Sequence, residues 1–137
     1  MSHRPAWAPA EIDIERPSVA RMYDFFLGGS HNFAADRELA EQALRVFPDA
    51  PHIVRANREF LHRAVRYLCD LGIDQFLDLG SGIPTVGNVH EVAASTGRPA
   101  RTVYVDSDHV AVAHATALLA ARLLLNAITV RVSAGMS

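Results

Sequence analysis

Two short segments of the sequence each join an apolar run to acidic residues. The first, Gln75–Gly82, reads QFLDLGSG and places Asp78 just before a Gly-Ser-Gly turn. The second, Val103–Asp108, reads VYVDSD and contains Asp106. This order is typical of a parallel sheet in which one strand leads into a glycine turn and the next strand brings a carboxylate to a ribose. The two segments therefore predict a nucleotide-cofactor site.

The residue types around the turn favour one class of cofactor. Gly80 and Gly82 lack a Cβ atom, so that a ligand can approach backbone N–H groups that we expect to face it. We expect Asp106 to accept hydrogen bonds from the ribose hydroxyls. Asp78 suits a cationic amino group or an ordered water and would repel a pyrophosphate.

A dinucleotide site is the competing interpretation of the same turn. Such a site prefers the pattern G-x-G-x-x-G, with a helix N-terminus facing the phosphates. Residues 80–87 read GSGIPTVG, where the third glycine comes late and Pro84 intervenes. The turn therefore favours S-adenosylmethionine, which carries an ammonium and a sulfonium and no phosphate, over NAD.

The same residues also have plain structural interpretations. Asp106 can be a helix-capping or turn acid, and Asp78 can be a solvated acid at a strand end. His31 and Asn32 can either face the cofactor or belong to a plain loop, and His90 and Glu91 can be general bases or surface and capping residues. We expect His114 to be a surface residue. We find no Ser/His/Asp order, no metal-ligand spacing and no phosphate-loop motif, so the catalytic residues are unknown and no metal is expected.

The bulk composition limits which classes of function the chain can have. The chain has 137 residues, of which 50% are hydrophobic and 20% charged, with a formal net charge of -2. These values indicate one globular domain and no signature of binding to nucleic acid or membrane. Cys69 is the single cysteine, and we expect a small buried residue there. No signal peptide or membrane span is apparent, so we expect a cytoplasmic protein.

The apolar periodicity predicts three helices followed by a β-α-β-α-β order. Residues 1–16 form a flexible N-terminal arm in this interpretation, and 17–137 form a single, partial domain. That domain divides into a helical cap, 17–72, and a Rossmann-like half, 73–137, with a parallel sheet. The expected elements are helices from Ser18 to Gly28, over about 35–47 and from Ile53 to Gly72, then strand 76–79, helix 89–96, strand 102–105, helix 109–125 and strand 128–132.

The three expected helices each carry an apolar face that we expect to be buried. The faces consist of Val19, Met22, Tyr23 and Phe26 in the first helix, Ala40, Ala43, Leu44 and Phe47 in the second, and Ile53, Ala56, Phe60, Leu61, Ala64, Val65 and Leu68 in the third. Strand 76–79 is short and apolar, which predicts a buried strand.

Three long strings give the chain a specific resemblance to a known family. They read RPSVARMYDFFLGGSHNFAADRE over 16–38, RANREFLHRAVRYL over 55–68 and QFLDLGSGIPTVGNVHEVA over 75–93. The chain resembles the actinobacterial S-adenosylmethionine-dependent methyltransferases that were formerly a domain of unknown function. The resemblance covers roughly residues 16–120. It implies an α/β class I methyltransferase fold and transferase activity on an unknown methyl acceptor.

The resemblance also implies roles for particular residues. Asp78, Gly80, Ser81 and Gly82 would form the first cofactor motif. Asp106 would be the ribose acid, with Ser107 near the adenosine.

The sequence after about Leu119 no longer resembles the family, whose members continue into further strands. We therefore expect a C-terminally truncated chain that shows little methyl transfer. The alternatives are a non-catalytic remnant or partner-binding pseudoenzyme and, with less support, an NAD-binding oxidoreductase fragment. A sheet that lacks neighbouring strands would leave 76–79 as an open apolar edge, which predicts self-association.

Overall fold

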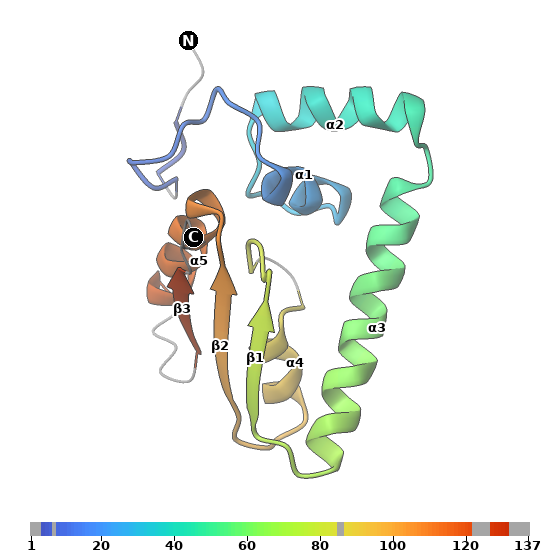
Figure 1. The fold of residues 1–137 in the computed structure, drawn as a ribbon, viewed down its shortest axis with the longest axis vertical. Coiled ribbons are helices and arrows are strands. Elements are labelled where there is room, and N and C mark those ends of the chain that lie inside the picture. The colour runs from blue at the N-terminus through green and yellow to red at the C-terminus, as the bar shows by residue number, and fades with distance from the viewer. Residues whose placement is uncertain (1–3, 7, 85–86, 122–126, 132–137) are drawn as a thin grey trace, which may run out of the picture.

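The computed structural model describes residues 4–6, 8–84, 87–121 and 127–131 and has the predicted α/β architecture. Helices and strands follow in the order α1 (Val19–Phe26), α2 (Ala34–Val46), α3 (Ala50–Asp70), β1 (Gln75–Leu79), α4 (Val89–Ser95), β2 (Arg101–Asp106), α5 (His109–Ala121) and β3 (Ala127–Arg131). The described strands form one parallel sheet in the order β1-β2-β3 (Figure 1). The predicted helices and the β-α-β-α-β order are confirmed over these residues.

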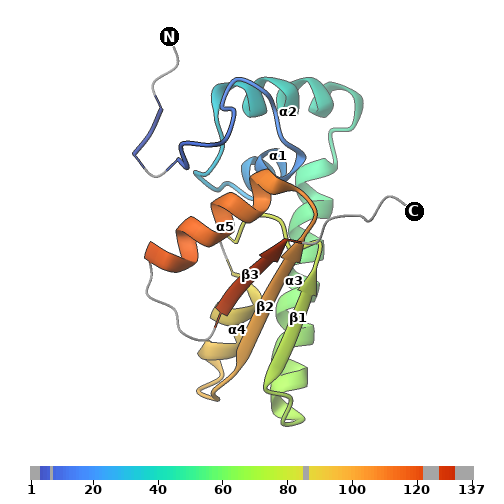
Figure 2. The same ribbon diagram turned by 60° about the vertical axis from the view of Figure 1, so that its left-hand side comes forward.

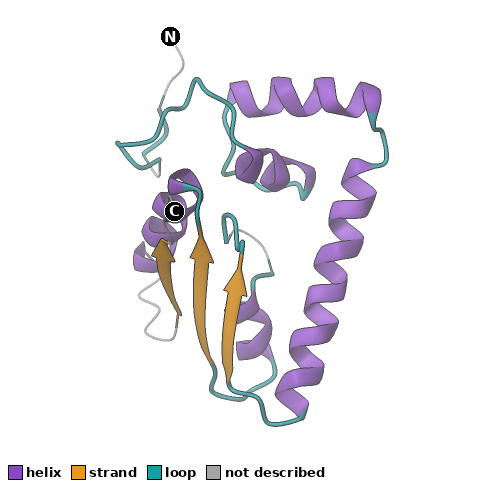
Figure 3. Cartoon of the chain, viewed as in Figure 1, coloured by secondary structure: helices purple, strands orange, loops and turns teal. Residues whose placement is uncertain are grey.

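Parallel pairing aligns the carboxyl ends of β1 and β2. Asp78 is opposite Tyr104, and Leu79 is opposite Val105. The pairing continues into the turn, because the N–H groups of Gly80 and Ser81 both donate to Val105 O, at 2.8 and 3.2 Å. Figure 3 shows these strand ends pointing toward α1. The sequence thus brings both acidic strand ends to one edge of the sheet, facing the helical cap.

Helices cover one face of the sheet. Figure 2 shows α3 and α4 behind the strands. The buried side chains of this core are Val65, Cys69, Val89, Val92, Ala93, Ala100, Tyr104, Leu119 and Ala127. The burial predicted for Cys69 is confirmed.

The other face of the sheet carries two rows of apolar side chains. Leu77 pairs with Val103, which pairs with Ile128, and Val105 stands between Leu79 and Val130 in the next row. The outer members of both rows are exposed, Leu77 by 63%. The expectation of a buried first strand is therefore wrong, because helices cover only one face of the described sheet.

A buried ion pair organises the N-terminal part. Arg21 Nε donates to Asp36 Oδ2 at 2.8 Å, and both side chains are 0% exposed. Asp36 also accepts hydrogen bonds from Ser18 N and Phe33 N, at 2.8 Å each. Arg21 Nη2 donates to the carbonyl of Asp13 at 3.2 Å. The pair therefore ties α1 to α2 and to the segment before them.

That preceding segment is packed against the domain. Ile12 and Ile14, within the expected flexible arm, are buried against Phe33. Arg4 Nη2 donates to Ile12 O at 2.8 Å, which closes the segment on itself. His114 of α5, a surface residue in one interpretation of the sequence, is buried as well and lies 6.2 Å from Phe33 between ring centroids. Burial lowers the pKa of His114 to about 4, helped by the nearby Arg21 and His31.

The expected helix faces are only partly correct. In α1 the buried residues are Arg21 and Asp24, whereas Val19 is 81% exposed. In α3 the buried residues are Val65 and Cys69, while Ile53 and Phe60 are exposed. The difference arises because polar contacts fix α1, and because α3 packs on α4 near its end and on α1 near its start. In α2 the buried residues are Asp36 and Ala40, and Phe47 beyond its end is exposed.

Replacement of Arg21 by methionine should lower the free energy of unfolding by about 3–5 kcal/mol, because Asp36 would keep a buried charge without its counterion. Urea unfolding of the purified chain at pH 7 measures the change. Arg45→Met is the matched control, since Arg45 is exposed on α2 and should change stability by less than about 0.5 kcal/mol. Equal transition midpoints for the two variants would contradict the structural role of the ion pair.

Candidate functional site

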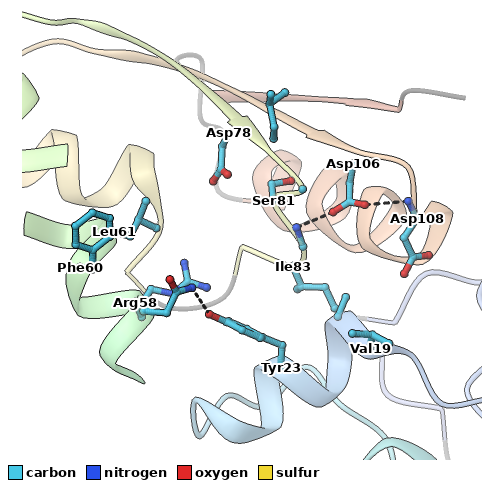
Figure 4. Close-up of a pocket in the computed structure, with 15 residues that line it drawn as sticks. Val19, Tyr23, Arg58, Phe60, Leu61, Asp78, Ser81, Ile83, Asp106 and Asp108 are labelled. Carbon is cyan, nitrogen blue, oxygen red and sulfur yellow. Dashed lines mark hydrogen bonds between the residues drawn. The ribbon is translucent and has the colours of Figure 1, made fainter. Parts of the chain in front are cut away.

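A cavity of about 640 Å³ lies at the carboxyl ends of β1 and β2, between the strands and the helices α1 and α3 (Figure 4). Its lining comprises Val19, Ala20, Tyr23, Asn57, Arg58, Phe60, Leu61, Asp78, Leu79, Gly80, Ser81, Gly82, Ile83, Asp106 and Asp108. The structure thus brings together all the residues predicted for a cofactor site except Ser107, which is exposed outside this lining. Among the described residues, no cluster of histidine, cysteine and acidic side chains could hold a metal ion.

The glycine turn opens the cavity to a ligand through missing side chains. Gly80 and Gly82 have φ angles of +68° and +63°, which residues with a Cβ rarely adopt. A Cβ built on either glycine would meet no atom within 4 Å, so the space beside the turn is open. The expectation that its N–H groups face a cofactor is wrong for residues 80–82. Gly80 and Ser81 donate to Val105 O, and Gly82 donates to Asp106.

Asp106 joins the loops that follow β1 and β2. Its Oδ2 accepts from Gly82 N at 2.8 Å, and its Oδ1 accepts from Asp108 N at 2.9 Å. The turn-acid interpretation of Asp106 therefore describes its contacts in this structure. Each carboxylate oxygen can accept a second hydrogen bond, so the same side chain still offers acceptors to the cavity. Asp108 in turn begins α5, because its Oδ1 accepts from Val110 N at 2.9 Å.

Asp78 is the second acid of the cavity, and its environment resists ionisation. Burial raises the pKa of Asp78 above its usual value; the cation of Arg58 lowers it and the neighbouring Asp106 raises it. Ser81 Oγ is also shielded from solvent and has no hydrogen-bond partner. The cavity therefore combines a partly desolvated carboxylate with an unsatisfied hydroxyl, an arrangement that a cationic or polar ligand would stabilise.

The helical cap contributes residues that the sequence analysis did not assign to the site. Asn57 Nδ2 of α3 donates to Tyr23 Oη of α1 at 3.1 Å. The guanidinium carbon of Arg58 lies 5.8 Å from the centroid of the Tyr23 ring. The sequence did carry one signal for these residues. Tyr23, Asn57 and Arg58 lie within two of the three strings that resemble the family, 16–38 and 55–68, although both strings are far from the glycine turn in the sequence.

The remaining candidate residues have structural roles. Asn32 Nδ2 and His31 N both donate to Asp24 Oδ2 at 2.8 Å, which builds the loop after α1. Glu91 Oε2 accepts from Asn88 N at 3.0 Å and so caps α4. His90 is buried against Tyr104, whose hydroxyl accepts from His90 N at 3.1 Å. The four sequence candidates on these elements all lie outside the cavity lining: His31, Asn32, His90 and Glu91.

The comparisons with known proteins agree with this geometry. A family model described as S-adenosyl methyltransferase matches residues 5–131. The crystal structure of a proposed methyltransferase from Thermobifida fusca YX has a TM-score of 0.80 and 45% identity, covering 94% of this chain and 48% of that chain. The crystal structure of a DUF574 family protein from Streptomyces avermitilis MA-4680 has a TM-score of 0.73 and 39% identity, covering 90% of this chain and 47% of that chain. The search of curated proteins found no match.

The chain therefore belongs to the S-adenosyl methyltransferase family, since the family model matches most of its length. The family's cofactor is S-adenosylmethionine. The predicted family and fold class are confirmed. The expectation that the resemblance ends after about Leu119 is wrong, because the family model matches through residue 131. The chain spans about half the length of the two solved proteins that it matches. None of the described helices combines the length and apolarity needed to cross a membrane.

Asp78→Asn should make the ligand-free protein more stable at pH 7. Folding raises the pKa of Asp78, so the folded state favours its protonated form and loses stability as the pH rises and the group ionises. The gain in melting temperature should be larger at pH 7 than near pH 4, because less of the carboxyl is ionised at the lower pH. Thermal unfolding at both pH values measures it, with exposed Asp74→Asn as the control. An Asp78→Asn protein that melts below the parent at pH 7 would show that the charge is stabilising.

Proposed function

We propose that this chain binds S-adenosylmethionine in the cavity between the sheet and the helical cap and supports methyl transfer to an acceptor. The observation that carries the proposal is the placement of Asp78 and Asp106 on two adjacent strand ends beside an open glycine turn. Asp78 would bind the ammonium of the cofactor, and Asp106 would accept from its ribose hydroxyls. Gly80 and Gly82 leave room for close approach, while Ser81 and Ser107 would lie near the ligand.

In this proposal the protein acts mainly by alignment. A nucleophilic atom of the acceptor attacks the methyl carbon in line with the sulfur, the carbon–sulfur bond breaks, and the electron pair stays on S-adenosylhomocysteine. The site contributes orientation and an electrostatic setting that suits the sulfonium. No general base is assigned. The proposal places the domain at 17–137, with the cap at 17–72 and the cofactor half at 73–137, in a cytoplasmic protein.

The competing NAD hypothesis is disfavoured by charge. Asp78 and Asp106 both line the cavity, and the pKa of Asp78 is raised mainly by burial and further by repulsion from Asp106. A pyrophosphate would add two further negative charges close to these acids. S-adenosylmethionine would instead add an ammonium and a sulfonium, which the same carboxylates attract.

Calorimetric titration of the purified chain at pH 7 should therefore give tighter binding of S-adenosylmethionine and S-adenosylhomocysteine than of NAD. Asp106→Ala should weaken S-adenosylhomocysteine binding by about 1–3 kcal/mol, because the ribose hydroxyls would lose a buried acceptor. Asp70→Ala, an exposed acid at the end of α3, should leave the affinity unchanged. Tighter binding of NAD would reject the proposal, and unchanged affinity in Asp106→Ala would restrict that residue to its turn contacts.

A non-catalytic, partner-binding role is the second candidate, and the uncovered sheet face favours it. Among the described strands β1 pairs on one side only, and Leu77 and Leu79 are exposed beside that edge. Ile128 and Val130 of β3 are exposed on the same face at the other side of the sheet. An open edge next to an apolar face is a template for association with another chain. In this candidate function the chain self-associates, or meets a partner, through the face opposite its helices.

The isolated chain should therefore associate with itself as its concentration rises, and Leu77→Lys should shift it toward the monomer. Light scattering after size-exclusion chromatography measures the mass of each species. Leu71→Lys is the matched control, because Leu71 is 62% exposed and Leu77 is 63% exposed, but Leu71 lies outside the sheet. A monodisperse monomer at every concentration, or equal effects of the two variants, would contradict association through this face.

A further inference from the structure

Arg58 places a positive charge in the same cavity as the two acids. It projects from α3, and Figure 4 shows it across the cavity from Asp78, with both side chains facing the space between the helical cap and the sheet. Asp78 belongs to β1 and Arg58 to α3, so the two charges come from separate elements of the fold. The cavity therefore holds opposite charges at two defined positions.

The guanidinium of Arg58 has unused hydrogen-bonding capacity. Its Nε is shielded from solvent and has no hydrogen-bond partner. Among the described residues the ion pairs within 4.0 Å are Arg21–Asp36 and His109–Asp108, so Arg58 has no carboxylate at that distance. A shielded donor without a partner destabilises the ligand-free protein, and a ligand acceptor would remove that cost. A guanidinium binds a carboxylate particularly well, because its N–H groups can form two parallel hydrogen bonds.

Tyr23 holds Arg58 in place from the other helix. The Tyr23 ring faces the guanidinium, with 5.8 Å between the ring centroid and the guanidinium carbon. Tyr23 is itself anchored to α3 by the hydrogen bond from Asn57 at 3.1 Å. An aromatic face orients a cation without neutralising its charge, so that Arg58 stays available to an anionic group.

We propose that Arg58 and Asp78 together recognise the zwitterionic amino-acid end of an S-adenosyl ligand, with Arg58 binding the carboxylate and Asp78 the ammonium. This inference rests on the proposed function and deepens it. It fixes the direction of the ligand, because the amino-acid end lies toward α3 and the ribose lies toward Asp106. It also makes Arg58 a specificity-determining residue that selects ligands with an intact carboxylate.

Two ligands distinguish recognition of the carboxylate by Arg58 from a purely structural role of Arg58 in the cavity. S-adenosylhomocysteine carries the amino-acid end, whereas 5′-methylthioadenosine keeps the adenosine and lacks the carboxylate and ammonium. Arg58→Gln should weaken S-adenosylhomocysteine binding by about tenfold or more, the loss of roughly one charge-assisted interaction. The same variant should leave 5′-methylthioadenosine binding within about twofold of the parent, since that ligand makes no contact that depends on charge at Arg58.

Matched variants complete the calorimetric experiment. Arg63→Gln removes the same charge from an exposed position of α3 and should change neither affinity. Arg58→Lys keeps the charge and should recover part of the S-adenosylhomocysteine affinity. Tyr23→Phe keeps the aromatic face but loses the hydrogen bond from Asn57, so it should lose less affinity for S-adenosylhomocysteine than Tyr23→Leu. Neither variant should change 5′-methylthioadenosine binding by more than about twofold. Thermal unfolding of each variant verifies that it is folded.

The outcomes distinguish this inference from the proposed function. Selective loss of S-adenosylhomocysteine binding in Arg58→Gln supports it. Equal loss of both ligands, or no loss of either, overturns it while the proposed function stands. A parent chain that binds 5′-methylthioadenosine and not S-adenosylhomocysteine also overturns it. A parent chain that binds neither ligand rejects the proposed function and this inference with it.

Discussion

The position of every cofactor candidate follows from the parallel pairing of β1 with β2. Because Leu79 is opposite Val105, the glycine turn begins beside the strand end that carries Asp106. Two N–H groups of the turn then bond to Val105 O, and the third bonds to the Asp106 carboxylate. The turn is thus fixed by β2 before any ligand arrives, and its open glycine surface and the Asp78 carboxylate face a preformed space.

The helical cap completes this space through polar contacts in its own interior. The Arg21–Asp36 pair fixes α1 against α2, and Tyr23, two residues after Arg21, then meets Asn57 and Arg58 on α3. An isolated sheet would offer the acids without a counter-charge. The cap adds the cation, so that charges of both signs line the cavity, as recognition of a zwitterion requires. Helix α1 thus carries both Arg21, which forms the buried ion pair, and Tyr23, which contacts the cation of the cavity.

Sequence reasoning predicted the part of the cavity lining that is local in the chain. Asp78, the glycine turn and Asp106 were predictable because strand periodicity and turn chemistry act over a few residues. The position of Arg58 in the cavity lining was not predictable in this way, since it depends on where a long helix lies relative to the sheet. The burial of Arg21, Asp36 and His114 was missed for a related reason, because apolar periodicity assigns charged and polar residues to the surface. The bare sheet face was missed because an apolar strand was taken to be covered on both sides.

The central claim is that an S-adenosyl ligand occupies the space between the two strand ends and the helical cap. Titration of the isotope-labelled chain with S-adenosylhomocysteine, followed by backbone amide NMR, tests it most directly. The account predicts shift changes concentrated at residues 78–83, at 106–108 and around 57–58, which line this cavity or adjoin it. Saturable shift changes confined to the exposed sheet face, or no changes at saturating ligand, would contradict it.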